Sequence, residues 1–303
     1  MDLCDNILNK GCILDKQLTI HEAVESAARY FDQQELYYGH GTDNAFDEAL
    51  SLVLYVLDLD YSITDDDLER VLSPSEQKKI DEIISQRIST RKPAVYLTHR
   101  TWFMGLEFYV DERVLVPRSP LAELIYNHYQ PWVKPEAVHN ILDLCTGGGC
   151  IAIASAVMFE QAHVVASDIS IDALEVCKKN IATHGLEKRV EAVQSDLFEN
   201  LQGRKFDLIV SNPPYVPNEA RTRLPREYLH EPEIGLYSGD SGLDIPMSIL
   251  RQAADYLTDD GVLIVEVGES EERMIEATKG LPLTWLEFEF GGEGVFVVSR
   301  KDL

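Results

Sequence analysis

Apolar residues recur with helical spacing through the first part of the chain. One stripe runs through residues 21–37 and a second through residues 46–57. Ser73-Pro74-Ser75-Glu76 then combines an N-cap, a proline at the first helical position and a capping-box glutamate, which predicts a helix to about Ser89. The loop Gly39-His40-Gly41-Thr42-Asp43-Asn44 is interpreted as a loop with a helix cap, with a functional role as the alternative. We expect a helical domain over residues 1–92.

After Arg100 the spacing of apolar residues changes from a helical pattern to one typical of strands. Residues 101–104, 106–110 and 114–116 predict short strands around tight turns, which we interpret as a connecting β-hairpin. Pro117-Arg118-Ser119-Pro120 follows and leads into a helix expected to run through Tyr129.

Strand and helix patterns alternate after Pro135. Alternation of this kind predicts an α/β domain with a Rossmann-like, doubly wound and mainly parallel sheet over residues 93–303, hairpin included. Two further β-rich runs, 284–290 and 295–299, predict a terminal hairpin whose last strand packs antiparallel at the sheet edge. The expected strands are 141–144, 164–167, 190–193, 208–210 and 262–267, and the expected helices are 151–159, 171–183, 247–257 and 271–279.

The charge balance of the 303 residues is strongly acidic, with a formal net charge of -25. Such a charge opposes a wide contact with a phosphate backbone, so stable nucleic-acid binding is not expected. The negative charge would attract a basic protein, although a generally acidic surface that keeps the protein soluble also accounts for this net charge.

The five cysteines have neither Cys-x-x-Cys spacing nor a histidine pairing, so we expect no disulfide framework and no metal site. No apolar run resembles a signal peptide or approaches the roughly 20 residues of a membrane span. We therefore expect a cytoplasmic protein. The cysteines are Cys4, Cys12, Cys145, Cys150 and Cys177.

Asn212-Pro213-Pro214-Tyr215 follows directly after an apolar run that reads as a buried strand. The carboxyl ends of such strands are where open α/β sheets bind ligands. Two prolines make a stiff bend whose free groups are carbonyl oxygens, beside the Asn212 amide, and Tyr215 adds a ring able to stack on a planar substrate. The segment predicts a site that accepts an NH2 group, with an ordinary proline turn as the alternative.

A glycine-rich loop stands at the end of the first main strand. Cys145-Thr146-Gly147-Gly148-Gly149 runs into a helix, so the backbone turns sharply and helix N–H groups point toward a ligand. Asp168, 19 residues after Gly149, ends the second strand, where a carboxylate accepts hydrogen bonds from ribose hydroxyls. Because Gly147-x-Gly149-x-x-Ala152 also matches the dinucleotide fingerprint, these residues do not separate NAD from another adenosine cofactor.

Two other carboxylates refine the choice of cofactor. Asp143 precedes the glycines, and its charge would repel a pyrophosphate but suit the ammonium or sulfonium of S-adenosylmethionine. Asp196 and Leu197 fall where an adenine ring would reach, the carboxylate to accept the amino group and the leucine to cover the face. A helix cap is an equally good interpretation of Asp196.

With these segments in this order, the chain resembles the class I S-adenosylmethionine-dependent methyltransferases. It is more narrowly similar to the protein-glutamine methyltransferases that modify release factors and a ribosomal protein. The ribosomal branch fits best, because the release-factor branch has Pro-Glu-Thr after the arginine where this chain has Ser119-Pro120-Leu121. The segments that resemble the ribosomal branch are 39–44, 96–103, 116–120 and 223–228.

The resemblance implies a substrate, a glutamine side chain of the third large-subunit ribosomal protein, and a set of functional residues. S-adenosylmethionine would lie against Asp143, Cys145, Thr146, Gly147, Gly148, Gly149, Asp168, Asp196, Leu197 and Asn212. The substrate amide would lie against Asn212, Pro213, Pro214 and Tyr215, with Arg118 in the substrate-binding set. Cys145 stands where a glycine is frequent, and Leu197 replaces an aromatic residue found in some relatives.

Four alternatives remain at this point. A release-factor glutamine methyltransferase is the nearest. A nucleic-acid exocyclic amine methyltransferase is the second, because an exocyclic amine also presents an NH2 group that must be held by hydrogen-bond acceptors. An NAD-dependent oxidoreductase and a non-catalytic adenosylmethionine-binding scaffold are the others. We assign substrate choice to residues 1–92, the hairpin region 101–116 and the polar segment 216–240, because a protein substrate needs more surface than one amide pocket provides.

Overall fold

The computed structural model describes residues 17–303, which divide after Thr98 into two compact units. The division falls later than residue 92 because the short helix α6 (Ala94–Thr98) belongs with the first unit, where Ala94 is buried in the core. No helix within residues 17–303 is both long and apolar enough to cross a membrane. Cys145, Cys150 and Cys177 are free thiols, whereas Cys4 and Cys12 lie outside the described residues.

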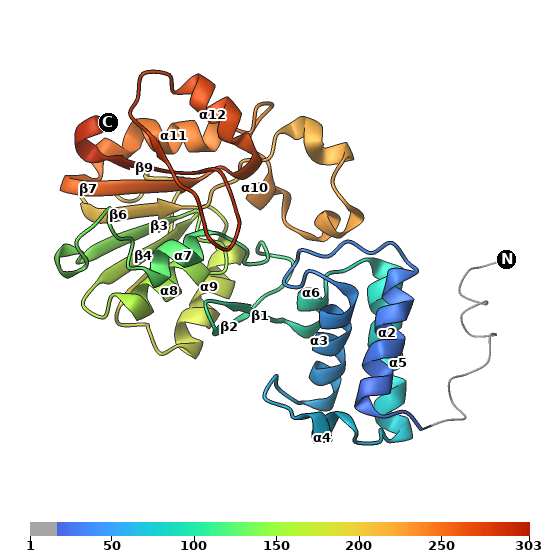
Figure 1. Ribbon diagram of the computed structural model, residues 1–303. Coiled ribbons are helices and arrows are strands. Elements are labelled where there is room, and N and C mark those ends of the chain that lie inside the picture. The colour runs from blue at the N-terminus through green and yellow to red at the C-terminus, as the bar shows by residue number, and fades with distance from the viewer. Residues whose placement is uncertain (1–16) are drawn as a thin grey trace. The chain divides into compact units, whose positions relative to one another are not determined.

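The first unit is helical (Figure 1). The three predicted helices are confirmed, and Ser73 and Glu76 form the expected capping box of α5. The short helices α4 and α6 were not predicted. The helices are α2 (Ile20–Asp32), α3 (Ala45–Leu57), α4 (Asp65–Leu68), α5 (Pro74–Thr90) and α6.

The loop over residues 39–44 caps a helix, as interpreted from the sequence. The Asn44 side chain accepts a hydrogen bond of 2.9 Å from the Asp47 N–H at the start of α3. Glu48 accepts a hydrogen bond from the Thr42 hydroxyl at 3.2 Å and pairs with the guanidinium of Arg87 at 2.7 Å. This buried pair holds the loop to α3 and α5.

The second unit begins with the antiparallel hairpin of β1 (Arg100–Phe103) and β2 (Leu106–Tyr109). The third strand expected at residues 114–116 is absent from the described chain, because this segment runs along a cavity instead of pairing with a neighbouring strand. Helix α7 (Leu121–Tyr126) ends before Tyr129, since His128 and Tyr129 both have φ near +54° and leave the helical conformation.

The main body is a seven-stranded sheet with the order β5-β4-β3-β6-β7-β9-β8. Only β9 runs in the direction opposite to the other six strands, so the expected mainly parallel α/β fold is confirmed. The last strand does not form the edge, because β9 lies between β7 and β8 and the two-residue β8 takes the edge position. The strands are β3 (Asn140–Leu144), β4 (His163–Asp168), β5 (Val190–Gln194), β6 (Phe206–Ser211), β7 (Leu257–Glu266), β8 (Thr284–Trp285) and β9 (Val295–Ser299).

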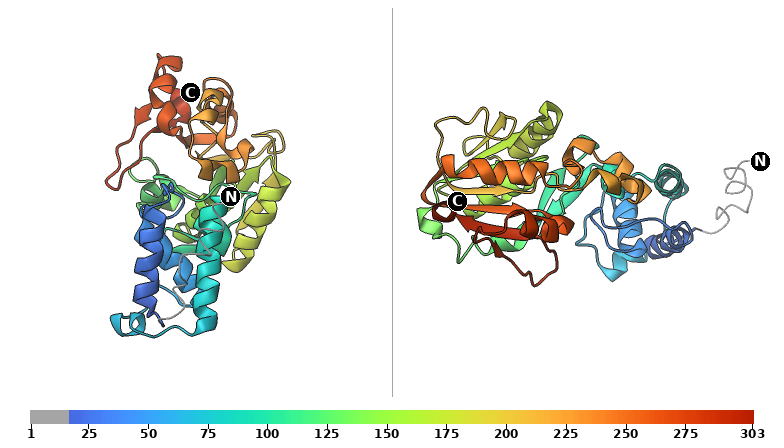
Figure 2. Two further views of the ribbon diagram at one scale, coloured as in Figure 1. Left: turned by 90° about the vertical axis from the view of Figure 1, so that its right-hand side faces the viewer. Right: turned by 90° about the horizontal axis from the view of Figure 1, so that it is seen from above.

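Helices cover both faces of this sheet (Figure 1). Alternate residues of each strand point to opposite faces, so Ile141 joins one core with α7 to α9 while Leu142 joins the other with α11. The right-hand view of Figure 2 looks down on the α11 side. These helices are α8 (Cys150–Met158), α9 (Ile171–Thr183), α11 (Asp244–Gln252) and α12 (Glu271–Ala277).

A long insertion separates β6 from α11, and short helical turns occupy it and the remaining connections. A parallel bridge between Val216 and Tyr237 closes the base of the insertion. The insertion contains η3 (Asn218–Thr222), η4 (Arg226–His230) and α10 (Glu233–Leu236), and the other turns are η2 (Pro135–Ala137), η5 (Ala253–Asp255), η6 (Gly268–Ser270) and η7 (Arg300–Asp302).

Candidate active site

The ends of β3 and β6 lie side by side at the point where the strand order reverses. In the parallel register Leu144 pairs with Ser211, and the Ser211 hydroxyl donates a hydrogen bond of 2.7 Å to the Leu144 carbonyl oxygen. The glycine loop after β3 and the tetrapeptide after β6 therefore begin next to each other. This switch point is where doubly wound sheets bind ligands.

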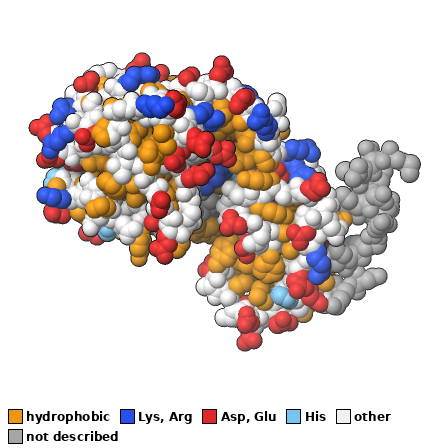
Figure 3. Space-filling model, turned by 45° about the horizontal axis from the view of Figure 1, so that its top comes forward, with side chains coloured by type: hydrophobic (Ala, Val, Ile, Leu, Met, Phe, Trp, Pro, Cys, Tyr) orange, Lys and Arg blue, Asp and Glu red, His pale blue; other side chains and the backbone are white. Residues whose placement is uncertain are grey.

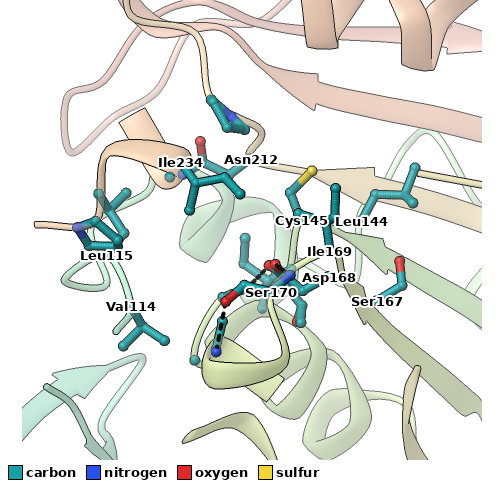
Figure 4. Close-up of a pocket in the computed structure, with 18 of the residues that line it drawn as sticks. Val114, Leu115, Leu144, Cys145, Ser167, Asp168, Ile169, Ser170, Asn212 and Ile234 are labelled. Carbon is teal, nitrogen blue, oxygen red and sulfur yellow. Dashed lines mark hydrogen bonds between the residues drawn. The ribbon is translucent and has the colours of Figure 1, made fainter. Parts of the chain in front are cut away.

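A cavity of about 220 Å³ opens there, which we call the main cavity. Figure 4 shows Cys145, Asp168 and Asn212 around the same hollow. Of the predicted site residues, the structure brings together at this cavity Arg118, Cys145, Thr146, Gly147, Gly148, Asp168, Asp196, Leu197, Asn212 and Pro214.

The glycine loop requires backbone conformations that side chains disfavour. Gly149 has a φ of 85°, and a Cβ there would lie 2.7 Å from the Cys177 Sγ, so only glycine lets α8 and α9 approach this closely. Gly149 itself does not line the main cavity.

Cys145 adopts a φ of 58°, a conformation that glycine takes without strain. Burial raises the pKa of the Cys145 thiol, which stays protonated and neutral.

Asp143 lies beneath the loop and does not line the main cavity. Its Oδ2 accepts hydrogen bonds from the Thr146 hydroxyl at 2.5 Å and the Ala152 N–H at 3.0 Å. Complete burial raises the pKa of this carboxyl to about 7. The carboxyl group thereby holds the loop to the start of α8, and the ligand contact expected of Asp143 stays a prediction.

Asp168 forms one wall of the main cavity. Its two oxygens accept hydrogen bonds of 2.9 Å from the N–H groups of Gly147 and Ser170. Figure 4 shows Asp168 beside Ser170 at the hollow. Burial raises the pKa of the carboxyl group. Each oxygen keeps a further lone pair, so hydroxyl groups of a ligand can still donate to this fixed carboxylate.

Asp196 and Leu197 lie on the same cavity, and the helix-cap interpretation of Asp196 does not hold for the described chain. A turn, not a helix, follows Asp196, and Ser195 caps it by accepting the Asn200 N–H at 3.0 Å. Leu197 has a φ of 45°, which turns the chain at the cavity wall. Ile169 and Ile234, which the sequence analysis did not single out, add apolar surface.

The tetrapeptide is divided between two hollows. Pro214 lines the main cavity, whereas Pro213 and Tyr215 line a second hollow of about 440 Å³ beside the 216–240 insertion, here called the insertion pocket. Asn212 lines both. Within residues 17–303, its side-chain amide forms no hydrogen bond to the protein. Asn212 is therefore available at the junction of the two hollows.

Glu266, at the end of β7, was missed by the sequence analysis. Its carboxyl group accepts hydrogen bonds from the Ser119 hydroxyl at 2.5 Å and the Tyr215 hydroxyl at 3.3 Å. Burial raises the pKa of Glu266 to about 7, against the opposing effects of these hydroxyls and of Arg118. The position of Glu266, a carboxylate directly after the apolar residues of a predicted strand, is the sequence feature that could have identified it.

Arg118 is paired with Glu231, a second residue that the sequence analysis did not identify. The guanidinium makes two hydrogen bonds, of 2.8 and 2.6 Å, to this buried carboxylate. The ion pair raises the pKa of Arg118 despite the opposing effect of burial. The Cζ atom of the Arg118 guanidinium lies over the Tyr228 ring, 5.2 Å from its centroid. The pair thereby ties the 116–120 segment to the insertion.

Two curated proteins match nearly the whole chain. The ribosomal protein uL3 glutamine methyltransferase of Neisseria gonorrhoeae is 46% identical over 286 residues, 94% of this chain and 95% of that protein. The protein of the same name from Francisella tularensis subsp. tularensis is 44% identical over 292 residues, 96% and 93% of the two chains. The chain belongs to the uL3 glutamine methyltransferase family.

Two further comparisons concern the methyltransferase domain and its fold. Residues 129–239 match the methyltransferase small domain. Among solved structures, the hMettl16 catalytic domain in complex with MAT2A 3'UTR hairpin 1 superposes with a TM-score of 0.53, over 82% of this chain and 91% of that one. At 16% identity this likeness concerns the fold alone. This member of the uL3 glutamine methyltransferase family is therefore an enzyme with a class I methyltransferase fold.

Proposed function

We propose that this enzyme transfers a methyl group from S-adenosylmethionine to the side-chain amide nitrogen of a glutamine in ribosomal protein uL3, in the cytoplasm. The names of the two full-length relatives support the reaction and the substrate. The observation that carries the proposal is the position of Asn212, which faces both the main cavity and the insertion pocket. A glutamine amide bound by Asn212 in the insertion pocket would face a cofactor bound in the main cavity.

The main cavity has the chemistry that S-adenosylmethionine needs. Asp168 presents a fixed carboxylate for ribose hydroxyls, and Asp196 offers an acceptor beside the apolar side chain of Leu197. A Cβ placed on Gly147 would meet nothing within 4 Å, which leaves room along the loop for the methionine part. When bound, the cofactor supplies a methyl group on a positively charged sulfur.

The chain's own contribution is orientation of a poor nucleophile, because the lone pair of an amide nitrogen is delocalised into the carbonyl. The Asn212 side-chain oxygen and the Pro213 carbonyl accept the two N–H groups and fix the nitrogen with its face toward the main cavity. Orientation of this type supplies about 7 to 11 kcal/mol in favourable cases. The two acceptors also stabilise the positive charge that develops on nitrogen. Water takes the departing proton, and no dedicated base is assigned.

The acidic surface favours a basic protein over a nucleic acid as substrate. On the face drawn in Figure 3, Lys and Arg side chains are scattered among acidic and apolar ones without forming a continuous basic surface. The net charge of -25 speaks against a long phosphate-backbone contact.

The test is to incubate the purified enzyme with labelled S-adenosylmethionine and, separately, ribosomal protein uL3, a release factor and deproteinised ribosomal RNA. We expect label on uL3, at a glutamine located by mass spectrometry. Label on the release factor or the RNA alone would replace the proposed substrate. Cofactor binding without transfer would indicate a scaffold, and a nicotinamide signal on binding NADH would indicate an oxidoreductase.

A further inference from the structure

We propose that a groove beneath Phe290 receives the polypeptide that flanks the target glutamine, with a basic side chain against its acidic rim and an apolar one on the Phe290 ring. This inference rests on the proposed function. The groove, of about 770 Å³, is here called the Phe290 groove. Its lining includes Arg118, Ser119, Glu123, Tyr126, Tyr215 and Phe290.

The Phe290 groove adjoins the amide site. Arg118 and Tyr215 line both this groove and the insertion pocket, so these two side chains border both hollows. A glutamine held by Asn212 lies within a polypeptide that must leave the site in two directions. The insertion pocket accommodates one direction, and the Phe290 groove accommodates the other.

Two aromatic rings at the groove are exposed to solvent. Phe290 has 86% of its surface exposed and Tyr126 has 71%. Large aromatic residues of this kind are enriched where proteins bind each other, because they bury much apolar area at a low cost in side-chain entropy. Exposed rings that border an active site indicate a surface completed by a partner.

The loop that presents Phe290 is anchored. The N–H groups of Glu289 and Phe290 donate to the Glu123 carboxylate of α7, at 3.0 and 3.4 Å. Gly292 has a φ of 106°, and a Cβ there would come within 2.6 Å of Pro120. The ring is therefore presented from a backbone already held in place, which reduces the entropy lost on binding.

The charge around the groove selects a basic occupant. Glu123 and Glu289 line the groove, and residues 284–294 contain no Lys or Arg. Arg118, the cation at the inner end, is neutralised by its contact with Glu231. A basic segment gains attraction at this rim, whereas a nucleic acid would be repelled.

The deciding experiment measures steady-state methyl transfer to uL3 by the full-length enzyme and by Phe290→Ser. We expect KM to rise about tenfold, the equivalent of about 1.4 kcal/mol, with kcat within roughly twofold of the wild type. Ile275→Ser on α12 is the matched control, because Ile275 is 43% exposed and lines none of the three hollows. Tyr126→Ser, at the second exposed ring that lines the groove, should reproduce the rise in KM and serves as the test if Phe290→Ser fails to bind cofactor.

A second arm tests the charge. Glu289→Gln should make KM less sensitive to salt, whereas Glu160→Gln, an equal charge change on an exposed residue away from the groove, should not. An unchanged KM in both Phe290→Ser and Tyr126→Ser, with the wild type active on uL3, overturns the docking proposal alone. A wild type inactive on uL3 overturns the proposed function and the docking with it. A dimer in light scattering that Phe290→Ser dissociates would assign the groove to a second copy and overturn the proposal.

Discussion

The phenolic hydroxyl of Tyr215 donates a hydrogen bond of 3.3 Å to Glu266, the last residue of β7. The same carboxyl group accepts the Ser119 hydroxyl, so it joins the tetrapeptide to the 116–120 segment. The Tyr215 ring packs so closely on Gly268 that a Cβ there would lie 2.7 Å away. Glu266 and Gly268 thus hold the Tyr215 ring in a fixed position at the insertion pocket.

The raised pKa of Glu266 predicts a pH-dependent stability. The pKa of about 7 keeps the carboxyl group largely protonated below that pH in the folded chain, whereas the unfolded chain releases the proton near the ordinary glutamate pKa of 4.5. The folded state thus binds more protons between these values, and the free energy of unfolding falls as pH rises through that window, by up to about 1.4 kcal/mol per pH unit. Asp143, with a pKa of about 7, contributes in the same direction.

Glu266→Gln should remove the Glu266 part of that fall, so urea unfolding between pH 4.5 and 7.5 should give a flatter curve than the wild type. Glu160→Gln, on an exposed carboxylate, is the control and should leave the slope unchanged. Parallel curves for the wild type and Glu266→Gln would show that the carboxyl group titrates normally.

Asn212→Ala should nearly abolish turnover while leaving cofactor binding largely intact. The substitution deletes an acceptor that orients the nucleophile, and the loss of one such contact costs about a hundredfold or more in rate. The measurement is kcat with uL3, together with S-adenosylhomocysteine affinity by calorimetry. Near-normal turnover would remove the role assigned to the tetrapeptide.

Asp168→Ala should weaken the binding of S-adenosylmethionine and S-adenosylhomocysteine together, since both share the ribose. Part of the effect will come from the loop, because the carboxylate also accepts the Gly147 N–H. Asp168→Asn, which keeps an acceptor oxygen, should bind more tightly than Asp168→Ala. Calorimetry that gives wild-type affinities for both ligands would contradict the cofactor geometry proposed here.

Removal of the helical unit should abolish methylation of uL3 while leaving cofactor binding intact. A chain beginning at His99 retains the whole sheet and both of its cores, so it should bind S-adenosylhomocysteine. It should lose methylation of intact uL3, because we propose that residues 1–98 supply part of the recognition surface. Undiminished transfer by the folded truncation would make the unit a stabilising appendage.

The sequence alone determined the features that depend on neighbouring residues. The capping box at Ser73 and the glycines before α8 specify local backbone geometry from a few adjacent positions. Because parallel strands place their carboxyl ends at one edge, Asp168 and Asn212 were predicted to share a site without any knowledge of register. The main cavity brings both together.

Only the tertiary structure decided which distant groups neutralise one another and which face the cavity. Arg118 and Glu231 are 113 residues apart, and no local pattern links them. Asp143 lies beneath the loop because its Oδ2 accepts hydrogen bonds from Thr146 and Ala152, an arrangement set by how α8 packs on β3. The position of β9 between β7 and β8 likewise depends on pairing across the whole sheet. Burial and long-range hydrogen bonding require the complete fold, so such contacts leave no signature in the spacing of residues along the chain.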